Sequence, residues 1–265
     1  MRKRFLRHAL IAIAVFLLAV TSVTLLLKNV RSRTNPAAAN SRVGIPSTVL
    51  WAWERPTDLS FIDPKSVGVA FLARTIRLSG DEVIVRPRLQ PVNLPTGSIV
   101  IAVARIETDR TNRAVLSQKQ SETLTDAVAE LAKLPNISAI QIDFDATRSE
   151  RDFYRNAIVS LRARLPKTIG LTITALASWC GDDDWISGLP IDEAVPMLFR
   201  MGPDRDQVKN FVSAQEDFSA AACRGSYGIS TDEQIANLDS RKRLYVFNPE
   251  PWTEESVRAI LEHRK

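Results

Sequence analysis

Eight short apolar segments, each four to eight residues long, recur along the chain after position 48 and alternate with stretches of helical spacing. The apolar segments cover residues 49–53, 67–73, 99–106, 137–144, 169–176, 194–199, 226–229 and 244–247. Apolar residues spaced for one face of a helix cover residues 116–134, 150–165, 204–218 and 254–263. Strands that alternate with helices predict a parallel sheet of the α/β class.

The number of strands favours a closed sheet. Eight strands within about 220 residues predict a short (β/α)8 TIM-like barrel, with a doubly wound sheet as the alternative. We prefer the barrel because polar side chains gather at the C-terminal ends of the predicted strands, where barrel sites are built. Residues 83–85 predict one more strand after the Gly80-Asp81 turn, so a β-hairpin replaces one helix. Ser149 and Thr253 are predicted to cap the helices that follow them.

The N-terminus predicts a membrane anchor. Residues 9–27 carry no charge and nearly span a hydrocarbon core as a helix. A secretory signal peptide is the alternative, but its cleavage site would follow the apolar stretch closely, and the first A-x-A sequence after that stretch lies at residues 37–39. We therefore divide the chain into an anchor or signal segment (residues 1–28), a polar tether (29–47) and a barrel domain (48–265).

Flanking charges predict the orientation of this segment. Four basic residues precede it and three follow it, which favours a cytoplasmic N-terminus. The expected location is the cell inner membrane, crossed once, with the domain facing the periplasm. Cys180 and Cys223 could form a disulfide there, although two buried thiols are an equally good interpretation.

The net charge of +5 arises from the N-terminus. Seven of the 35 basic residues lie in the first 35 positions, so the remainder carries 28 basic and 30 acidic residues. A slightly acidic domain lacks the basic face that binds phosphate, which argues against a nucleic-acid partner.

The segment with the clearest chemistry is Ile140-Gln141-Ile142-Asp143-Phe144-Asp145. Strand alternation places Gln141, Asp143 and Asp145 on one face and the apolar residues on the other. Burying two ionised carboxylates on one face of a central strand is unfavourable unless other groups compensate. Either arginines pair with them in a structural network, or the two form a functional site in which their like charges raise one pKa.

Asp143-Phe144-Asp145 at the end of the fourth strand resembles the D-x-D core of chitinase-type family 18 glycoside hydrolases. Met197 to Arg200 resembles that family's M-x-Y-D, and Trp252 is similar in place to its floor tryptophan. The chain departs from the pattern where the catalytic glutamate falls on Thr147, and the tyrosine and aspartate fall on Phe199 and Arg200. The resemblance therefore implies a barrel and a sugar-binding type of cleft without the family's chemistry.

A second resemblance extends over most of the domain. Its segments are residues 51–55, 69–74, 141–145, 177–180 and 196–200, which resemble a bacterial family known only as a domain of unknown function. This resemblance implies a TIM-barrel-like fold and no activity.

The strand ends supply further candidates. The predicted catalytic residues are Asp143, Asp145 and Glu54. The predicted substrate-binding residues are Trp53, Arg74, Glu107, Trp179, Met197, Phe199, Arg200, Asn248 and Trp252. Arg105 and Glu250 also lie near strand ends, and flat tryptophan faces suit sugar rings as well as they suit a core.

Other chemistries lack support. Asp182-Asp183-Asp184 does not have calcium-loop spacing and is predicted to begin a helix, with Trp185 packing below it. Ser178 has no G-x-S-x-G context, and the sequence has no G-x-G-x-x-G. We expect neither a metal nor a cofactor. Two functions remain open: a glycoside hydrolase-like enzyme with Asp145 as proton donor, and a non-catalytic glycan-binding or scaffold protein of the cell envelope.

Overall fold

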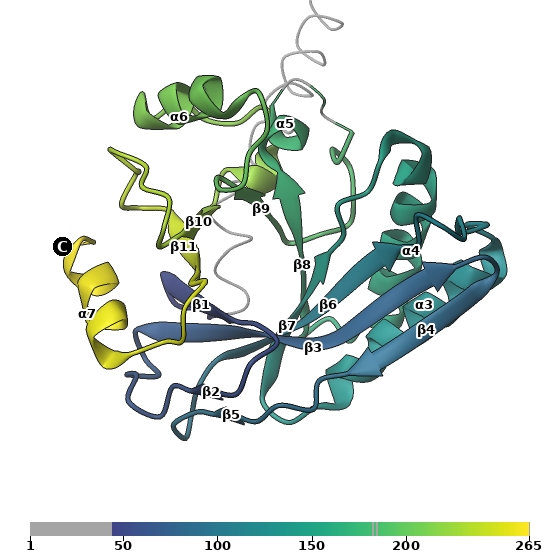
Figure 1. The fold of residues 1–265 in the computed structure, drawn as a ribbon, viewed down its shortest axis with the longest axis horizontal. Helices are drawn as coiled ribbons and strands as arrows, with labels where there is room; N and C mark the ends of the chain where they lie inside the picture. The colour runs from purple at the N-terminus through teal and green to yellow at the C-terminus, as the bar shows by residue number, and fades with distance from the viewer. Residues whose placement is uncertain (1–43, 182, 184, 265) are drawn as a thin grey trace, which may run out of the picture. The chain divides into compact units, whose positions relative to one another are not determined.

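The computed structural model describes residues 44–264 apart from Asp182 and Asp184, and these residues belong to one compact unit. Eight parallel strands of this unit close into a barrel (Figure 1). They are β1 (Thr48–Ala52), β3 (Val67–Ser79), β6 (Val100–Thr108), β7 (Ile137–Asp143), β8 (Gly170–Leu176), β9 (Glu193–Met197), β10 (Ser226–Ser230) and β11 (Arg243–Phe247). All eight correspond to predicted strands.

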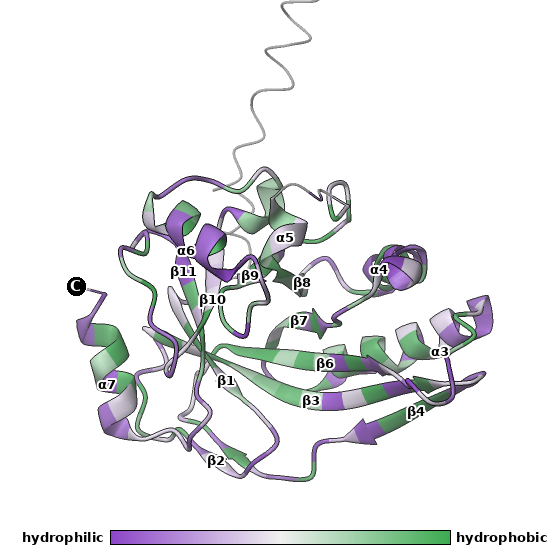
Figure 2. Ribbon diagram, turned by 45° about the horizontal axis from the view of Figure 1, so that its top comes forward, coloured by the Kyte–Doolittle hydropathy of each residue, from purple (hydrophilic) through white to green (hydrophobic). Residues whose placement is uncertain are grey.

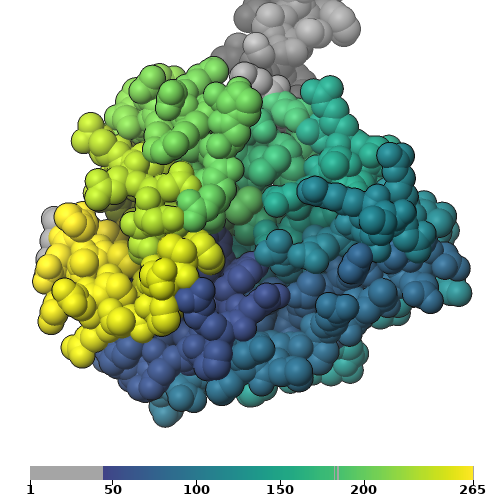
Figure 3. Space-filling model, in the orientation of Figure 1, coloured from purple at the N-terminus to yellow at the C-terminus, as the bar shows by residue number. Residues whose placement is uncertain are grey.

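The sheet closes because β1 pairs with β3 on one side and with β11 on the other. The structure thus confirms the barrel and rules out the doubly wound sheet. In Figure 3 the yellow C-terminal segment borders the purple surface of the N-terminal part of the described chain, in agreement with the pairing of β1 and β11.

The predicted hairpin is also confirmed. Strand β4 (Glu82–Pro87) runs antiparallel to the second half of β3, and the turn uses Gly80 at φ +55°. A positive φ at this position favours glycine. Two short strands, β2 (Thr57–Asp58) and β5 (Val92–Asn93), pair with each other outside the barrel.

Helices cover part of the barrel. The predicted helices appear as α3 (Gln118–Ala129) with η1 (Glu130–Lys133), α4 (Arg151–Arg164), α6 (Arg205–Ser213) and α7 (Glu254–Glu262). The shorter elements η2 (Arg148–Glu150), α5 (Ala177–Cys180) and η3 (Ala221–Cys223) accompany them. In Figure 2, most of the visible surface of α4 is hydrophilic, whereas β6 is hydrophobic over most of its length.

One predicted cap is confirmed and one is wrong. Thr253 caps α7, and its side chain accepts a hydrogen bond from the Ser256 amide. Ser149 does not cap a helix, because it lies inside η2. Thr147 begins that turn, and the Glu150 carboxylate accepts a hydrogen bond of 2.7 Å from the Thr147 backbone amide.

The predicted helix start at the aspartate triplet is wrong as well. The helix in this region, α5, ends before the triplet, and Asp183 lies in a turn where it forms an ion pair with Arg151. Trp185 packs edge-on against Trp179, with ring centroids 5.0 Å apart.

The barrel separates two hydrophobic cores. The interior core includes Val49, Trp51, Leu72, Val103 and Tyr245. The other core lies between the strands and the helices and is the larger of the two. At the N-terminal end of the barrel, Arg243 pairs with buried Glu193 at 2.7 Å, and the Tyr245 hydroxyl donates to the same carboxylate. This ion pair closes that end, so the barrel opens at the C-terminal ends of its strands.

Cys180 and Cys223 form a disulfide that joins α5 to η3, with Cα atoms 5.8 Å apart. Of the two interpretations that the sequence left open, the structure shows the disulfide. The bond holds the segment after β8 against the segment before β10.

Among the described residues, no helix is long and apolar enough to cross a membrane. The predicted anchor (1–28) and residues 29–43 of the predicted tether lie outside the described residues.

Candidate functional site

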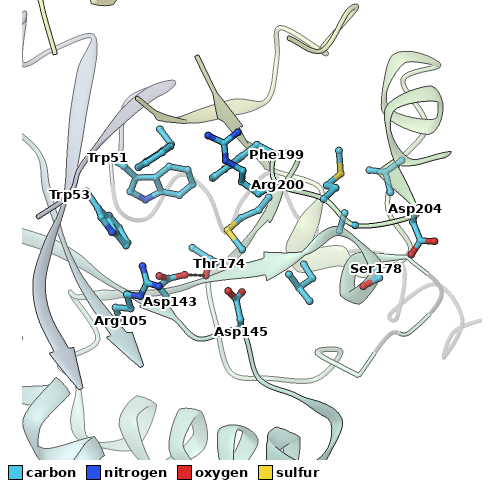
Figure 4. Close-up of a pocket in the computed structure, with 17 residues that line it drawn as sticks. Trp51, Trp53, Arg105, Asp143, Asp145, Thr174, Ser178, Phe199, Arg200 and Asp204 are labelled. Atoms are coloured by element: carbon cyan, nitrogen blue, oxygen red, sulfur yellow. Dashed lines mark hydrogen bonds between the residues drawn. The ribbon is translucent and has the colours of Figure 1, made fainter. Parts of the chain in front are cut away.

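Strand β7 positions two carboxylates at the open end of the barrel. Ile140, Ile142 and Phe144 pack into the outer core, as predicted from their alternation. On the inner face, Gln141 is fully buried, and its side-chain oxygen accepts a hydrogen bond of 2.8 Å from the Trp51 indole. Asp143 and Asp145 therefore emerge from the floor of the barrel into the space above it (Figure 4).

That space is an open cleft of about 550 Å³, within the range of small-molecule sites. Its polar part contains Asp143, Asp145, Arg105 and Thr174. Arg105 and Thr174 lie on β6 and β8, Asp143 is the last residue of β7, and Asp145 follows it in the chain. In Figure 4, these side chains gather on one side, and Ser178 and Asp204 lie at the opposite end.

Asp143 has an unusual protonation equilibrium. Burial raises the pKa of its carboxyl to about 6, and the nearby negative charge of Asp145 adds to this effect. A hydrogen bond of 2.7 Å from the Thr174 hydroxyl and the positive charge of Arg105 oppose it. The loss of hydration is therefore the largest influence on this group.

The pKa of Asp145 is also raised, because neighbouring protein atoms remove part of the hydration of its carboxyl although the side chain is exposed, while Arg105 lowers it. The side chain nevertheless retains solvent contact through the cleft mouth. A carboxyl with a raised pKa and access to a ligand is suited to proton transfer.

The nearby arginines have other ion-pair partners. Arg105 pairs with Glu107 at 2.8 Å, and its guanidinium lies over the Trp53 ring, 5.7 Å from the centroid. Arg200 pairs with Asp232 and Glu233, each at 2.6 Å. Within residues 44–264 as described, neither carboxylate of the β7 pair takes part in an ion pair.

An aromatic wall lies beside the carboxyls. Phe199 and Phe247 stack in parallel with centroids 5.7 Å apart, Trp51 lies 6.2 Å from Phe199, and Trp53 meets Phe247 edge-on at 6.5 Å. Gly228 provides the space for Trp51, because a Cβ at that position would lie 2.9 Å from the indole ring. The wall offers apolar ring faces to a ligand that contacts the carboxyls.

Six predicted site residues line this cleft together: Trp53, Asp143, Asp145, Met197, Phe199 and Arg200. The other six lie elsewhere. Glu54 is exposed and does not line the cleft, and Glu107 pairs with Arg105 at the rim.

Arg74 points away from the cleft. A β-bulge between Leu72 and Arg74 shifts the register of β3, so Arg74 turns outward and donates to the Ala127 carbonyl on α3. The strict alternation that we assumed from the sequence does not hold beyond such a bulge.

Trp179, Trp252 and Asn248 have structural contacts. Trp179 is 2% exposed and packs in the outer core, and the Trp252 indole donates to the Trp51 carbonyl at 2.9 Å. The Asn248 side-chain oxygen accepts a hydrogen bond from Thr231.

The sequence prediction also missed cleft residues. Trp51 shares a strand face with Trp53, and Thr174 lies on the inner face of β8, so alternation could have identified both. Phe247 is the last residue of β11, and its apolar character predicted a strand residue but not a cleft residue. Across the described part of the chain, no group of three or more His, Cys, Asp or Glu side chains could hold a metal ion.

Comparisons with known proteins add little beyond this geometry. No family model matches the chain, and no curated protein matches it. The solved structures that match include the Bacillus cereus spore cortex-lytic enzyme SleL, at 13% identity and a TM-score of 0.45. The match covers 72% of this chain and 54% of the SleL chain, so this chain corresponds to about half of SleL.

Asp143→Asn tests the raised pKa. The native state with a pKa near 6 holds a proton that the unfolded state, with a pKa near 4, releases, so stability falls as the pH rises through this window. Asparagine can still accept the Thr174 hydrogen bond. We expect the variant to gain about 1–3 kcal/mol over the wild type between pH 4 and pH 7 in chemical denaturation.

The matched control is Asp58→Asn. The pKa of this exposed carboxyl is lowered by the Ser60 amide, so the stability that Asp58→Asn loses relative to the wild type should develop below about pH 4 and stay nearly constant up to pH 7. A stability difference for Asp143→Asn that stays flat across the pH range contradicts the raised pKa.

Proposed function

We propose that the barrel domain binds a carbohydrate in the cleft and acts on it as a glycoside hydrolase-like enzyme. The observation that carries the proposal is the β7 carboxyl pair: both pKa values are raised, and the pair lies in an open cleft beside an aromatic wall. Glycoside hydrolysis requires a carboxylic acid that is still protonated near the working pH.

In this proposal, Asp145 donates its proton to the glycosidic oxygen as the bond to the anomeric carbon breaks. The reactive form of the pair holds one proton, on Asp145, so that Asp143, ionised and held by Thr174, stabilises the positive charge that develops on the sugar ring. Water then attacks the anomeric carbon and returns a proton to Asp145. Glu54 takes no part, because it does not line the cleft.

A non-catalytic glycan-binding protein is the second candidate, and one observation favours it. Thr147 occupies the position of the family 18 catalytic glutamate, and its hydroxyl donates to the Glu150 carboxylate at 2.8 Å. This residue therefore serves the start of a helical segment rather than the cleft.

Product analysis separates the two candidates. The full chain is incubated with a panel of envelope and extracellular polysaccharides, and the products are identified by mass spectrometry. We expect hydrolysis to pass through a pH optimum at which the pair holds one proton, falling at lower pH as Asp143 becomes protonated and at higher pH as the pair loses its last proton. We also expect a loss of about 10²–10⁴-fold in kcat for Asp145→Asn with glycan binding retained.

Asp152→Asn is the control, since this exposed carboxylate lies on α4 outside the cleft and should leave turnover unchanged. Binding of a glycan by the wild type without any product would support the non-catalytic candidate. Full turnover by Asp145→Asn would contradict the assigned proton donor.

We further propose that residues 1–28 anchor the chain in the inner membrane and that the domain faces the periplasm. The apolar N-terminal stretch and its flanking charges support this arrangement. The disulfide supports it as well, because such bonds persist in oxidising compartments.

Reporter fusions after Lys265 test the orientation. A reporter that is active only in the periplasm should be active, and one that is active only in the cytoplasm should be silent. The reverse pattern would place the domain in the cytoplasm and contradict the proposal.

A further inference from the structure

Away from Asp143, Asp145 and the aromatic wall, the lining of the cleft is mostly apolar, with Ser178 and Asp204 as its exposed polar residues. This apolar compartment consists of Leu176, Ala177, Met197, Met201 and Val208. They come from the end of β8, from α5, from β9 and the segment after it, and from α6. Figure 4 shows Ser178, which follows Leu176 and Ala177 in the chain, and Asp204, which lies between Met201 and Val208, at the end of the cleft away from Trp53 and Arg105. Met197 is the β-sheet partner of Leu176.

The apolar compartment is accessible to solvent. Leu176 is 40% exposed, and Met197, Met201 and Val208 are half-buried. A single exposed leucine needs no explanation, but several apolar side chains gathered in one concave surface indicate a binding surface. Two of the side chains are methionines, which adapt to ligands of different shape.

The two ends of the cleft suit different chemical groups. Asp143, Asp145 and Arg105 can form hydrogen bonds with the hydroxyls of a sugar. The five side chains of the apolar compartment offer no strong hydrogen-bonding group. A bare sugar ring placed over these five side chains would lose hydrogen bonds to water and could replace them only at Ser178 and Asp204 on the exposed edge, whereas an alkyl or acyl chain would gain by leaving water.

We propose that the carbohydrate carries an alkyl or acyl group and that this group occupies the apolar compartment while the sugar lies at the carboxyl pair. The inference rests on the proposed function, since it extends the same cleft. It names the substrate class as an acylated or lipid-linked carbohydrate. The substituent enters past Ser178 and Asp204, which lie at the solvent side of the compartment.

A series of n-alkyl β-glucosides and n-alkyl N-acetyl-β-glucosaminides, from methyl to hexyl, tests the proposal by calorimetry on the full chain. Each methylene that enters the apolar compartment should lower Kd about fourfold. Leu176→Asn and Met201→Gln should reduce this gain to less than about twofold per methylene.

Leu89→Asn is the matched control, because Leu89 is 85% exposed and lies outside the cleft. It should keep the full chain-length dependence. All variants are compared under identical conditions, so partitioning of the probes into lipid or detergent is common to all of them, and thermal melts confirm that each variant folds.

The outcomes separate this inference from the proposed function. Sugar binding without chain-length dependence, or an equal dependence in all variants, overturns the apolar compartment and leaves the proposed function standing. The neutral fluorophore N-phenyl-1-naphthylamine provides the converse test. If it binds the wild type and is lost from Leu176→Asn and Met201→Gln, while no glycoside of either series binds, the carbohydrate function is overturned and the apolar site remains. Absence of both kinds of binding overturns both.

Discussion

Closure of the parallel sheet determines where every functional side chain can lie. Because β1 pairs with both β3 and β11, each strand has one face inside the barrel and one face against the outer layer. The interior has room for few side chains, and Trp51 fits there because residue 228 is a glycine without a Cβ. Once the ion pair of Arg243 and Glu193 fills the N-terminal end, polar groups on the inner faces reach solvent only at the C-terminal end.

The carboxyl pair of β7 follows from this constraint. The Gln141 side-chain oxygen accepts a hydrogen bond from the Trp51 indole inside the barrel, and the next two inward positions, Asp143 and Asp145, reach the cleft. Loss of hydration raises the pKa of both carboxyls, and the two arginines that line the cleft, Arg105 and Arg200, form ion pairs with other acids. This arrangement costs stability at neutral pH, which is a cost typical of a site rather than of a structural ion pair.

Much of the fold could be predicted because apolar runs and helical spacing are local signals. All eight barrel strands, the hairpin and the four longer helices follow from them. The register within β3 could not be predicted, since the bulge that turns Arg74 outward depends on pairing with β6. The sequence did not show whether Trp53 and Trp179, which both lie near strand ends, belong to the site or to the core. In the structure Trp53 lines the cleft, whereas Trp179 lies in α5 and points into the outer core.

The site itself was predictable in its centre and not at its edges. Alternation identified Asp143 and Asp145, but the apolar compartment is assembled from α5, α6 and two strand ends that no local pattern brings together. The proposed function depends on the carboxyl pair, and the proposed substrate class depends on the apolar compartment.

The protonation of the β7 pair tests the account most directly. A ¹³C NMR titration of the aspartate side-chain carboxyls, with Asp143→Asn and Asp145→Asn used for assignment, should show Asp143 titrating near pH 6 and a coupled, raised midpoint for Asp145. Midpoints near or below pH 4 for both carboxyls would show that they are hydrated or ion-paired like ordinary surface acids, and would contradict the assignment of this cleft as the functional site.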